Sequence, residues 1–207
     1  MEITNVKVYD LEESIKASKY PMAINTQICS EEITNTVKSL GNSYIGSGHD
    51  NFLNGIRVAF DLTVSNKVWV ELERYHFFDF VSSQSTMHKI TKLDIKQQCN
   101  QYVWDSTIES LEKKVKEYNE REQYLKSNKN LSIDEKNICI KIQKELYLEI
   151  LYNVPSGFEL TARMTTNYRQ LKTVFYQRKN HKLPEWREFC SWLENNLPYF
   201  KELCLMR

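Results

Sequence analysis

The first residue that could do chemistry is His49, which follows Gly48 and precedes Asp50 in a glycine-rich stretch. A histidine held in a loop can donate or accept a hydrogen bond and changes charge near neutral pH. Such a residue could contact a polar ligand in a cleft. The alternative is a loop histidine with no special role.

A second group begins at Arg74-Tyr75-His76 and continues into the polar run 82–88, which contains Gln84 and Ser85. An arginine offers a fork of donors, and hydroxyl and amide groups can donate or accept. This mixture suits a phosphate or a polar heterocycle. The alternative is a solvated loop whose arginine lays its aliphatic stem on apolar surface.

A third group lies in the C-terminal part of the chain and contains Arg163, Arg178 and His181. A basic cluster at the end of a helix can bind a phosphate. Lysines at the same place also complement the helix dipole without any ligand. The dipole explains Lys179 and Lys182 well, but it explains Arg178 and His181 less well.

Several function classes are disfavoured by what the sequence lacks. It has no Ser/His/Asp order, no HExxH, no glycine-rich phosphate loop and no acid–base pair of carboxylates. Its five cysteines form no CxxC pair, which argues against a disulfide framework and a metal site. The net charge of +1 gives no field that would attract polymeric nucleic acid or a membrane. No run approaches the roughly 20 apolar residues of a membrane span. We therefore expect a cytoplasmic protein with reduced thiols.

Hydrophobic periodicity predicts the elements that position these groups. Alternating residues predict strands over 3–10 and 56–64, and a short helix is predicted over 66–73. Long helices are predicted over about 104–127, from a Ser132 capping signal to about 153, and over about 158–180. Shorter helices are predicted over 11–18, from Ser30 to Gly41 and over 184–196, with strand-like alternation at the end of 80–92 and an interhelical turn over 126–130. The sequence predicts an α+β fold, with a small antiparallel or mixed sheet packed with long helices, in a single domain over 1–207.

The order of these segments resembles the flavin-dependent thymidylate synthases. In that family a Gly-His pair, a strand and a short helix precede an Arg-His-Arg motif, and here Gly48-His49 precedes Arg74-Tyr75-His76. Later, Val154-Pro155 is followed by Tyr168 and, ten residues on, Arg178. The resemblance covers roughly 40–100 and 150–195.

The resemblance implies FAD held between the subunits of a homotetramer. It also implies dUMP as substrate, methylenetetrahydrofolate as carbon donor and NADPH as reductant. By position, FAD would be bound by His49, Arg74, Tyr75 and His76. Gln84 or Ser85 would take the place of the family's serine near the nucleotide, and the substrate would contact Arg163, Arg178 and His181.

The chain also departs from the family pattern. Tyr75 replaces the central histidine of the motif, and His76 replaces its second arginine. A phosphate-binding arginine of the family falls at Leu160, for which Arg163, about one helical turn on, could substitute. Two hypotheses follow: a diverged enzyme that methylates a pyrimidine deoxynucleotide, and a catalytically inactive module on the same fold that binds a nucleotide or a protein. An unrelated α+β domain is the third possibility.

Overall fold

The computed structural model describes residues 1–128 and 130–206. They form two compact units, each assembled from separate stretches of the chain. Unit 1 comprises residues 1–63, 70–82 and the described residues from 162 onward, and unit 2 comprises residues 64–69 and 83–161. The expected single domain stays a prediction, and each unit is described by itself.

The fold is α+β and contains a four-stranded sheet of order β1-β2-β4-β3. Its strands are β1 (Glu2–Tyr9), β2 (Arg57–Ser65), β3 (Asp79–Ser83) and β4 (Glu159–Asn167). β1 runs antiparallel to β2, with Ile3 opposite Leu62 and Val8 opposite Val58. The strands predicted over 3–10 and 56–64 are thus confirmed.

The long helix predicted over 158–180 is wrong in its first half. Residues 159–167 form β4, and helix α8 (Tyr168–Arg178) begins only after it. β4 carries three threonines, a β-branched residue that favours strands, and buries alternate residues Ala162, Met164 and Thr166. The Asn167 side chain then caps α8 by accepting from Gln170 N at 2.8 Å.

Unit 1 contains short helices around the sheet strands. They are α1 (Leu11–Ala17), α2 (Asn35–Gly41), α9 (Pro184–Asn196), α10 (Phe200–Cys204) and 3-10 turns at Tyr20–Met22, Thr26–Ile28 and Asn51–Asn54. Helix α3 (Asn66–Leu72) follows β2. The helix predicted from Ser30 begins instead at Asn35, because Thr34 supplies the capping oxygen to Val37 N.

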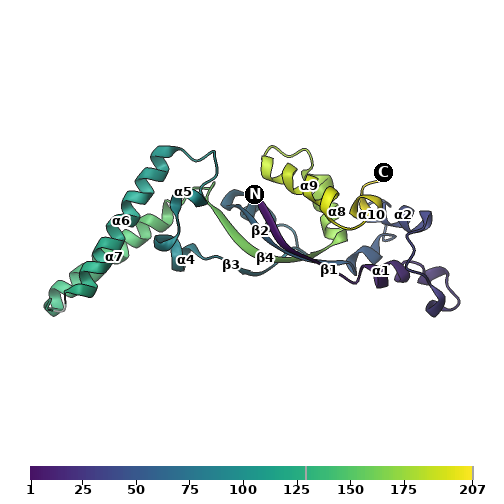
Figure 1. Ribbon diagram of the computed structural model, residues 1–207, viewed down its shortest axis with the longest axis horizontal. Helices are drawn as coiled ribbons and strands as arrows, with labels where there is room; N and C mark the ends of the chain where they lie inside the picture. Colours follow the sequence, from purple (N-terminus) through teal and green to yellow (C-terminus); the bar gives the residue numbers. More distant parts are fainter. Residues whose placement is uncertain (129, 207) are drawn as a thin grey trace. The chain divides into compact units, whose positions relative to one another are not determined.

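The core of unit 1 is aromatic. The ring of Phe60 on β2 lies 5.9 Å from those of Phe78 and Trp192 and 6.1 Å from that of Phe189, measured between centroids. Helices α8 and α9 lie over this face of the sheet (Figure 1). Phe189 and Trp192 belong to α9, and because aromatic rings contribute large apolar areas, this packing holds α9 against β2.

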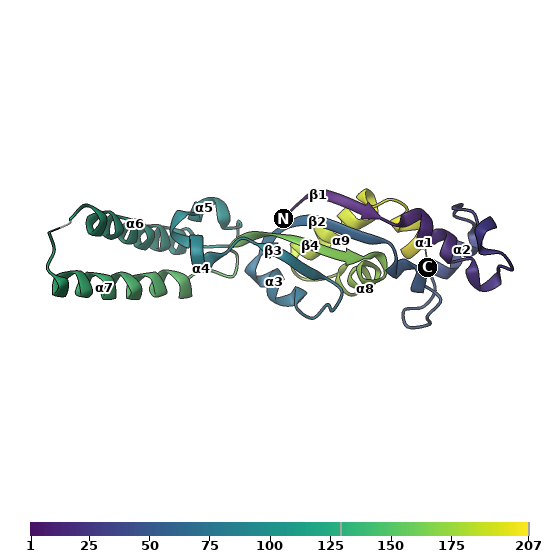
Figure 2. The ribbon, with the colours of Figure 1, turned by 90° about the horizontal axis from the view of Figure 1, so that it is seen from below.

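Unit 2 is built around two long helices, α6 (Asp105–Ser127) and α7 (Ile133–Tyr152), which lie side by side in both views (Figures 1 and 2). The capping box of Ser132 and Glu135 at the start of α7 is confirmed. The segment predicted to end in strand-like alternation is instead helical, as α4 (Thr86–Lys89) and a 3-10 turn (Ile90–Lys92), followed by α5 (Ile95–Gln98). The turn predicted over 126–130 includes Lys129, which lies outside the described residues. Within residues 1–128 and 130–206, no helix is both long and apolar enough to cross a bilayer.

Candidate functional site

A pocket of about 300 Å³ lies in unit 1 between the segment after α3 and one side of α8. The segment contributes Arg74, Tyr75, His76 and Phe77, and α8 contributes Gln170, Thr173 and Gln177. Residues three, four and seven positions apart share a helix face. The spacing of the three α8 residues therefore places their side chains on the same side.

The two cationic or potentially cationic groups of the pocket are exposed. The side chains of Arg74 and His76 form no hydrogen bond or ion pair with any residue in the described part of the chain. Thr173 Oγ1 donates to the carbonyl oxygen of Arg169 at 3.2 Å. Arg74 and His76 therefore offer the pocket hydrogen-bond donors without a protein partner, which suits a ligand rich in acceptor oxygens.

Beside the pocket, Arg178 is buried and only 6% exposed. Its Nη1 lies 2.9 Å from Glu71 Oε2, which also accepts from Trp186 Nε1 at 3.0 Å. The guanidinium carbon lies 4.8 Å from the centre of the Trp186 ring, a distance at which a cation is attracted to the ring face. His181 Nε2 lies 3.5 Å from the same Glu71 oxygen. Arg178 and His181, both predicted to contact substrate, are therefore engaged with a carboxylate of their own chain.

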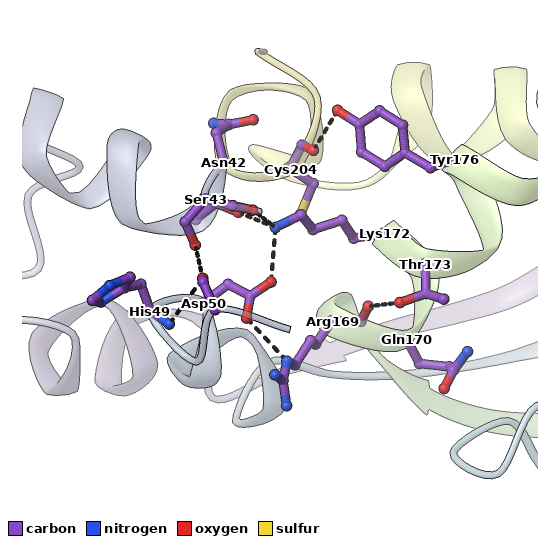
Figure 3. A network of polar contacts seen from close by, with 12 residues as sticks. Asn42, Ser43, His49, Asp50, Arg169, Gln170, Lys172, Thr173, Tyr176 and Cys204 are labelled. Carbon is purple, nitrogen blue, oxygen red and sulfur yellow. Dashed lines mark hydrogen bonds and ion pairs between the residues drawn. The ribbon is translucent and has the colours of Figure 1, made fainter. Parts of the chain in front are cut away.

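A second polar network lies on a neighbouring side of α8 (Figure 3). Lys172 Nζ donates to Asp50 Oδ2 at 2.7 Å and to the backbone oxygens of Gly41 and Ser43 at 2.7 and 2.8 Å. Arg169 Nε donates to Asp50 Oδ1 at 3.0 Å. The side chains of Lys172 and Asp50 are both 0% exposed. The network fastens the glycine-rich loop to α8 and so determines where the loop's exposed His49 lies.

Sequence reasoning missed this network. The available signal was a lysine among the apolar positions Leu171 and Val174, together with an aspartate beside His49 in a glycine-rich loop. A buried lysine requires a buried partner. Sequence alone does not say which of 27 acidic residues supplies it.

Arg163 lies on β4 and not on a helix. Its Nη1 donates to the backbone oxygen of Asn5 at 2.8 Å and lies 3.1 Å from Asp61 Oδ1. Hydrogen bonds from Asn5 and then Arg163 hold the pKa of Asp61 below its usual value. The argument that Arg163 lies one helical turn from Leu160 is wrong, because both residues belong to β4. Successive residues of a strand point to opposite faces, so positions 160 and 163 face opposite sides of the sheet.

Gln84 and Ser85 belong to unit 2. Gln84 N donates to Thr161 O and Gln84 Oε1 accepts from Thr161 N, both at 2.9 Å. The Ser85 carbonyl oxygen accepts from Lys89 N at 3.0 Å at the start of α4. Their proposed place near the nucleotide stays a prediction.

The structure thus brings together only some of the predicted residues. Arg74, Tyr75 and His76 line one pocket, whereas Arg178 and His181 meet at Glu71. The pocket residues Gln170 and Thr173 were missed, although their helical spacing with Gln177 was visible in the sequence. In the described ranges, no group of three His, Cys, Asp or Glu side chains could hold a metal ion.

The whole chain is similar in fold to solved structures of a flavin-dependent thymidylate synthase. A crystal structure of ThyX from Helicobacter pylori in complex with FAD and dUMP is 15% identical, with a TM-score of 0.61 over 100% of this chain and 98% of that one. A second structure of the same enzyme with FAD and dUMP is 14% identical, with a TM-score of 0.61 and full coverage of both chains. No protein-family model and no curated protein sequence matches this chain.

Proposed function

We propose that this chain binds a flavin nucleotide in the α8 pocket and acts as a diverged flavin-dependent thymidylate synthase. One observation carries the proposal: Arg74 and His76 lie unpaired beside three polar side chains of α8, on a fold similar to that of an enzyme solved with FAD and dUMP. Cationic side chains without a partner in the described part of the chain keep their hydrogen-bond donors available to a phosphate.

The residues of the pocket fit part of a flavin nucleotide. Arg74 and His76 would hold a phosphate, while Gln170, Thr173 and Gln177 would hold polar edges of the ligand. The volume of about 300 Å³ is at the low end for small-molecule sites, so the pocket takes one portion of FAD. When bound, the flavin supplies the hydride chemistry, and the protein supplies binding and orientation.

The finer parts of the proposal follow from the family resemblance. They are methylation of dUMP to dTMP, methylenetetrahydrofolate as carbon donor, NADPH as reductant, a homotetramer and a cytoplasmic location. Arg163, Arg178 and His181 remain proposed substrate contacts. A charged-group hydrogen bond to a phosphate is worth about 1.5–3 kcal/mol, so each would matter to affinity.

The first test is an absorbance and fluorescence titration of the purified protein with FAD. We expect saturable binding with a shifted flavin spectrum. A protein that neither carries flavin nor changes the spectrum on titration would contradict the proposal. Expression in a thymidine-requiring strain then tests the reaction, and growth without thymidine is the expected result.

The second candidate is a module that binds a nucleotide without turning it over. It is favoured by the ion pairs of Arg178 with Glu71 and of Arg163 with Asp61, which occupy both arginines proposed for the substrate. Under this alternative the protein binds FAD or a nucleotide but does not restore growth. The two experiments together therefore separate the two candidates.

A further inference from the structure

Tyr75 is placed differently from its neighbours in the chain. Arg74 and His76 are exposed, whereas Tyr75 is 6% exposed, and its ring lies 6.2 Å from that of Trp186 in an edge-to-face arrangement. Its hydroxyl has two partners, Arg178 Nε at 2.8 Å and Gln177 Oε1 at 3.0 Å. The hydroxyl therefore connects a buried arginine to a residue of the pocket.

The direction of these two hydrogen bonds follows from the chemistry of the groups. A guanidinium can only donate, so the Tyr75 oxygen accepts from Arg178. The hydroxyl has one hydrogen left, and its partner is the Gln177 side chain. Since a donor needs an acceptor, the oxygen of the Gln177 amide faces Tyr75 and its NH2 group faces away.

Arg178 is itself held in a single orientation. Its Nη1 is bound to Glu71, and its guanidinium lies over the Trp186 ring. Its Nη2 is buried and has no hydrogen-bond partner within the described residues. Because Arg178 cannot reverse its role, it sets the hydrogen-bond direction of Tyr75, and Tyr75 sets that of Gln177.

The pocket consequently gains a donor of fixed direction. Gln177 Nε2 has no partner among the residues that the structure describes, and it lies in the same pocket as the unpaired Arg74 and His76. An amide that was free to rotate would offer an oxygen as readily as a nitrogen. Held by Tyr75, it offers only hydrogens, which favours a ligand edge made of acceptors.

We propose that Tyr75 is a positioning residue that keeps Gln177 as a donor, so that the α8 pocket selects the phosphate end of its nucleotide. This inference rests on the proposed function and deepens it by naming which part of a flavin nucleotide the pocket binds. The flavin ring also has acceptor oxygens. Comparing ligands with and without a phosphate shows whether the pocket binds the phosphate or the ring.

The experiment compares FAD, FMN and riboflavin binding to the wild type, Tyr75→Phe, Gln177→Met and the double variant. For FAD and FMN we expect each single variant to lose about tenfold in affinity, the order of one hydrogen bond to a charged group. The double variant is expected to lose no more than Gln177→Met alone, because Tyr75 acts through Gln177. Riboflavin, which lacks a phosphate, should bind weakly and equally to all four proteins.

A matched control is Tyr176→Phe. It removes the hydroxyl of a tyrosine on α8 that donates to Cys204 O at 3.3 Å. It should leave flavin-nucleotide affinity unchanged. If the two losses multiply in the double variant, or if Tyr75→Phe folds and binds FAD like the wild type, the inference is wrong. Riboflavin binding as tight as FMN binding would assign the donors to the ring and would also overturn it.

Two further arms keep the outcome decisive. If Tyr75→Phe does not fold, Gln177→Glu replaces it, because a carboxylate still accepts from Tyr75 but has no NH2 to donate; unchanged FMN affinity would then refute the inference. If the wild type does not bind FAD, the proposed function fails, and inorganic diphosphate is titrated instead. Binding of diphosphate that weakens in Gln177→Met supports the inference, and no binding rejects it.

Discussion

Charged side chains are paired on one side of helix α8 and unpaired on a neighbouring side. On one side Lys172 and Arg169 meet Asp50, and every charge has a partner inside the protein. On the other side Arg74 and His76 stand beside Gln177 with no partner in the described part of the chain. Lys172 and Thr173 are adjacent on α8, yet Lys172 belongs to the paired side and Thr173 lines the pocket. We call the side with paired charges the closed side and the side with the pocket the open side.

This difference separates charges that stabilise the fold from charges that are free to act. Removing one member of a buried ion pair leaves the other uncompensated, which costs far more than the pair itself contributes. Removing an exposed, unpaired charge leaves nothing behind. Substitutions on the closed side should therefore lower stability, and substitutions on the open side should lower ligand affinity.

The largest expected effect is that of Lys172→Met on stability. The variant leaves Asp50 buried with a single ion pair, and we expect a loss of about 3–5 kcal/mol in the free energy of unfolding. Urea denaturation measures it. Lys179→Met is the control: this exposed lysine lies just after α8, with its Nζ 5.1 Å from the centre of the Tyr176 ring, and its loss should cost no more than about 1 kcal/mol. Equal small effects of both substitutions would remove the distinction between the two sides.

The next effect is that of Arg74→Met on ligand binding. We expect FAD affinity to fall by about tenfold or more, since a charge-assisted hydrogen bond is worth about 1.5–3 kcal/mol. Stability should stay within about 0.5 kcal/mol of the wild type, as for other exposed residues. A titration with FAD and a denaturation curve on the same sample test both halves. If Arg74→Met lost much stability and kept its FAD affinity, Arg74 would act in the fold and not in ligand binding, which would contradict the prediction.

The smallest effect concerns the partly exposed pair of Asp61 and Arg163, which lies between the two extremes. The pKa of Asp61 is lowered in the folded protein, so its stabilisation is present above the unfolded pKa, about 3.9, and is lost as pH falls toward the folded value. Asp61→Asn should therefore be less stable than the wild type at pH 7, by much less than Lys172→Met. The difference should shrink as pH drops below about 4. A difference independent of pH would show that the charge of Asp61, held by Asn5 and Arg163, does not contribute.

Much of the local structure was predictable because its signals are local. The alternation of Val58, Phe60, Leu62 and Val64 predicted β2, and the Ser132–Glu135 capping box predicted the start of α7. Each signal lies within a few residues, so no distant contact is needed to read it. The grouping of Arg74, Tyr75 and His76 was likewise visible in the sequence.

The failures came where the partner is distant in sequence. Residues 159–167 could join a helix or a strand by local preference, and their place between β2 and β3 in the sheet decided for the strand. The prediction that Arg178 contacts substrate did not foresee its ion pair with Glu71, which lies 107 residues away. Lys172 was missed for the same reason, since its partner Asp50 lies 122 residues away.

Local patterns in the chain were enough to predict the alternation of β1 and β2, the capping box at the start of α7 and the resemblance to a thymidylate-synthase fold. Which charged side chains find partners within the protein, and which stay without one, emerged only once the chain was folded. The physical reason is that charge compensation depends on distance in space. Neighbours along a helix, such as Lys172 and Thr173, face different partners as soon as the helix packs.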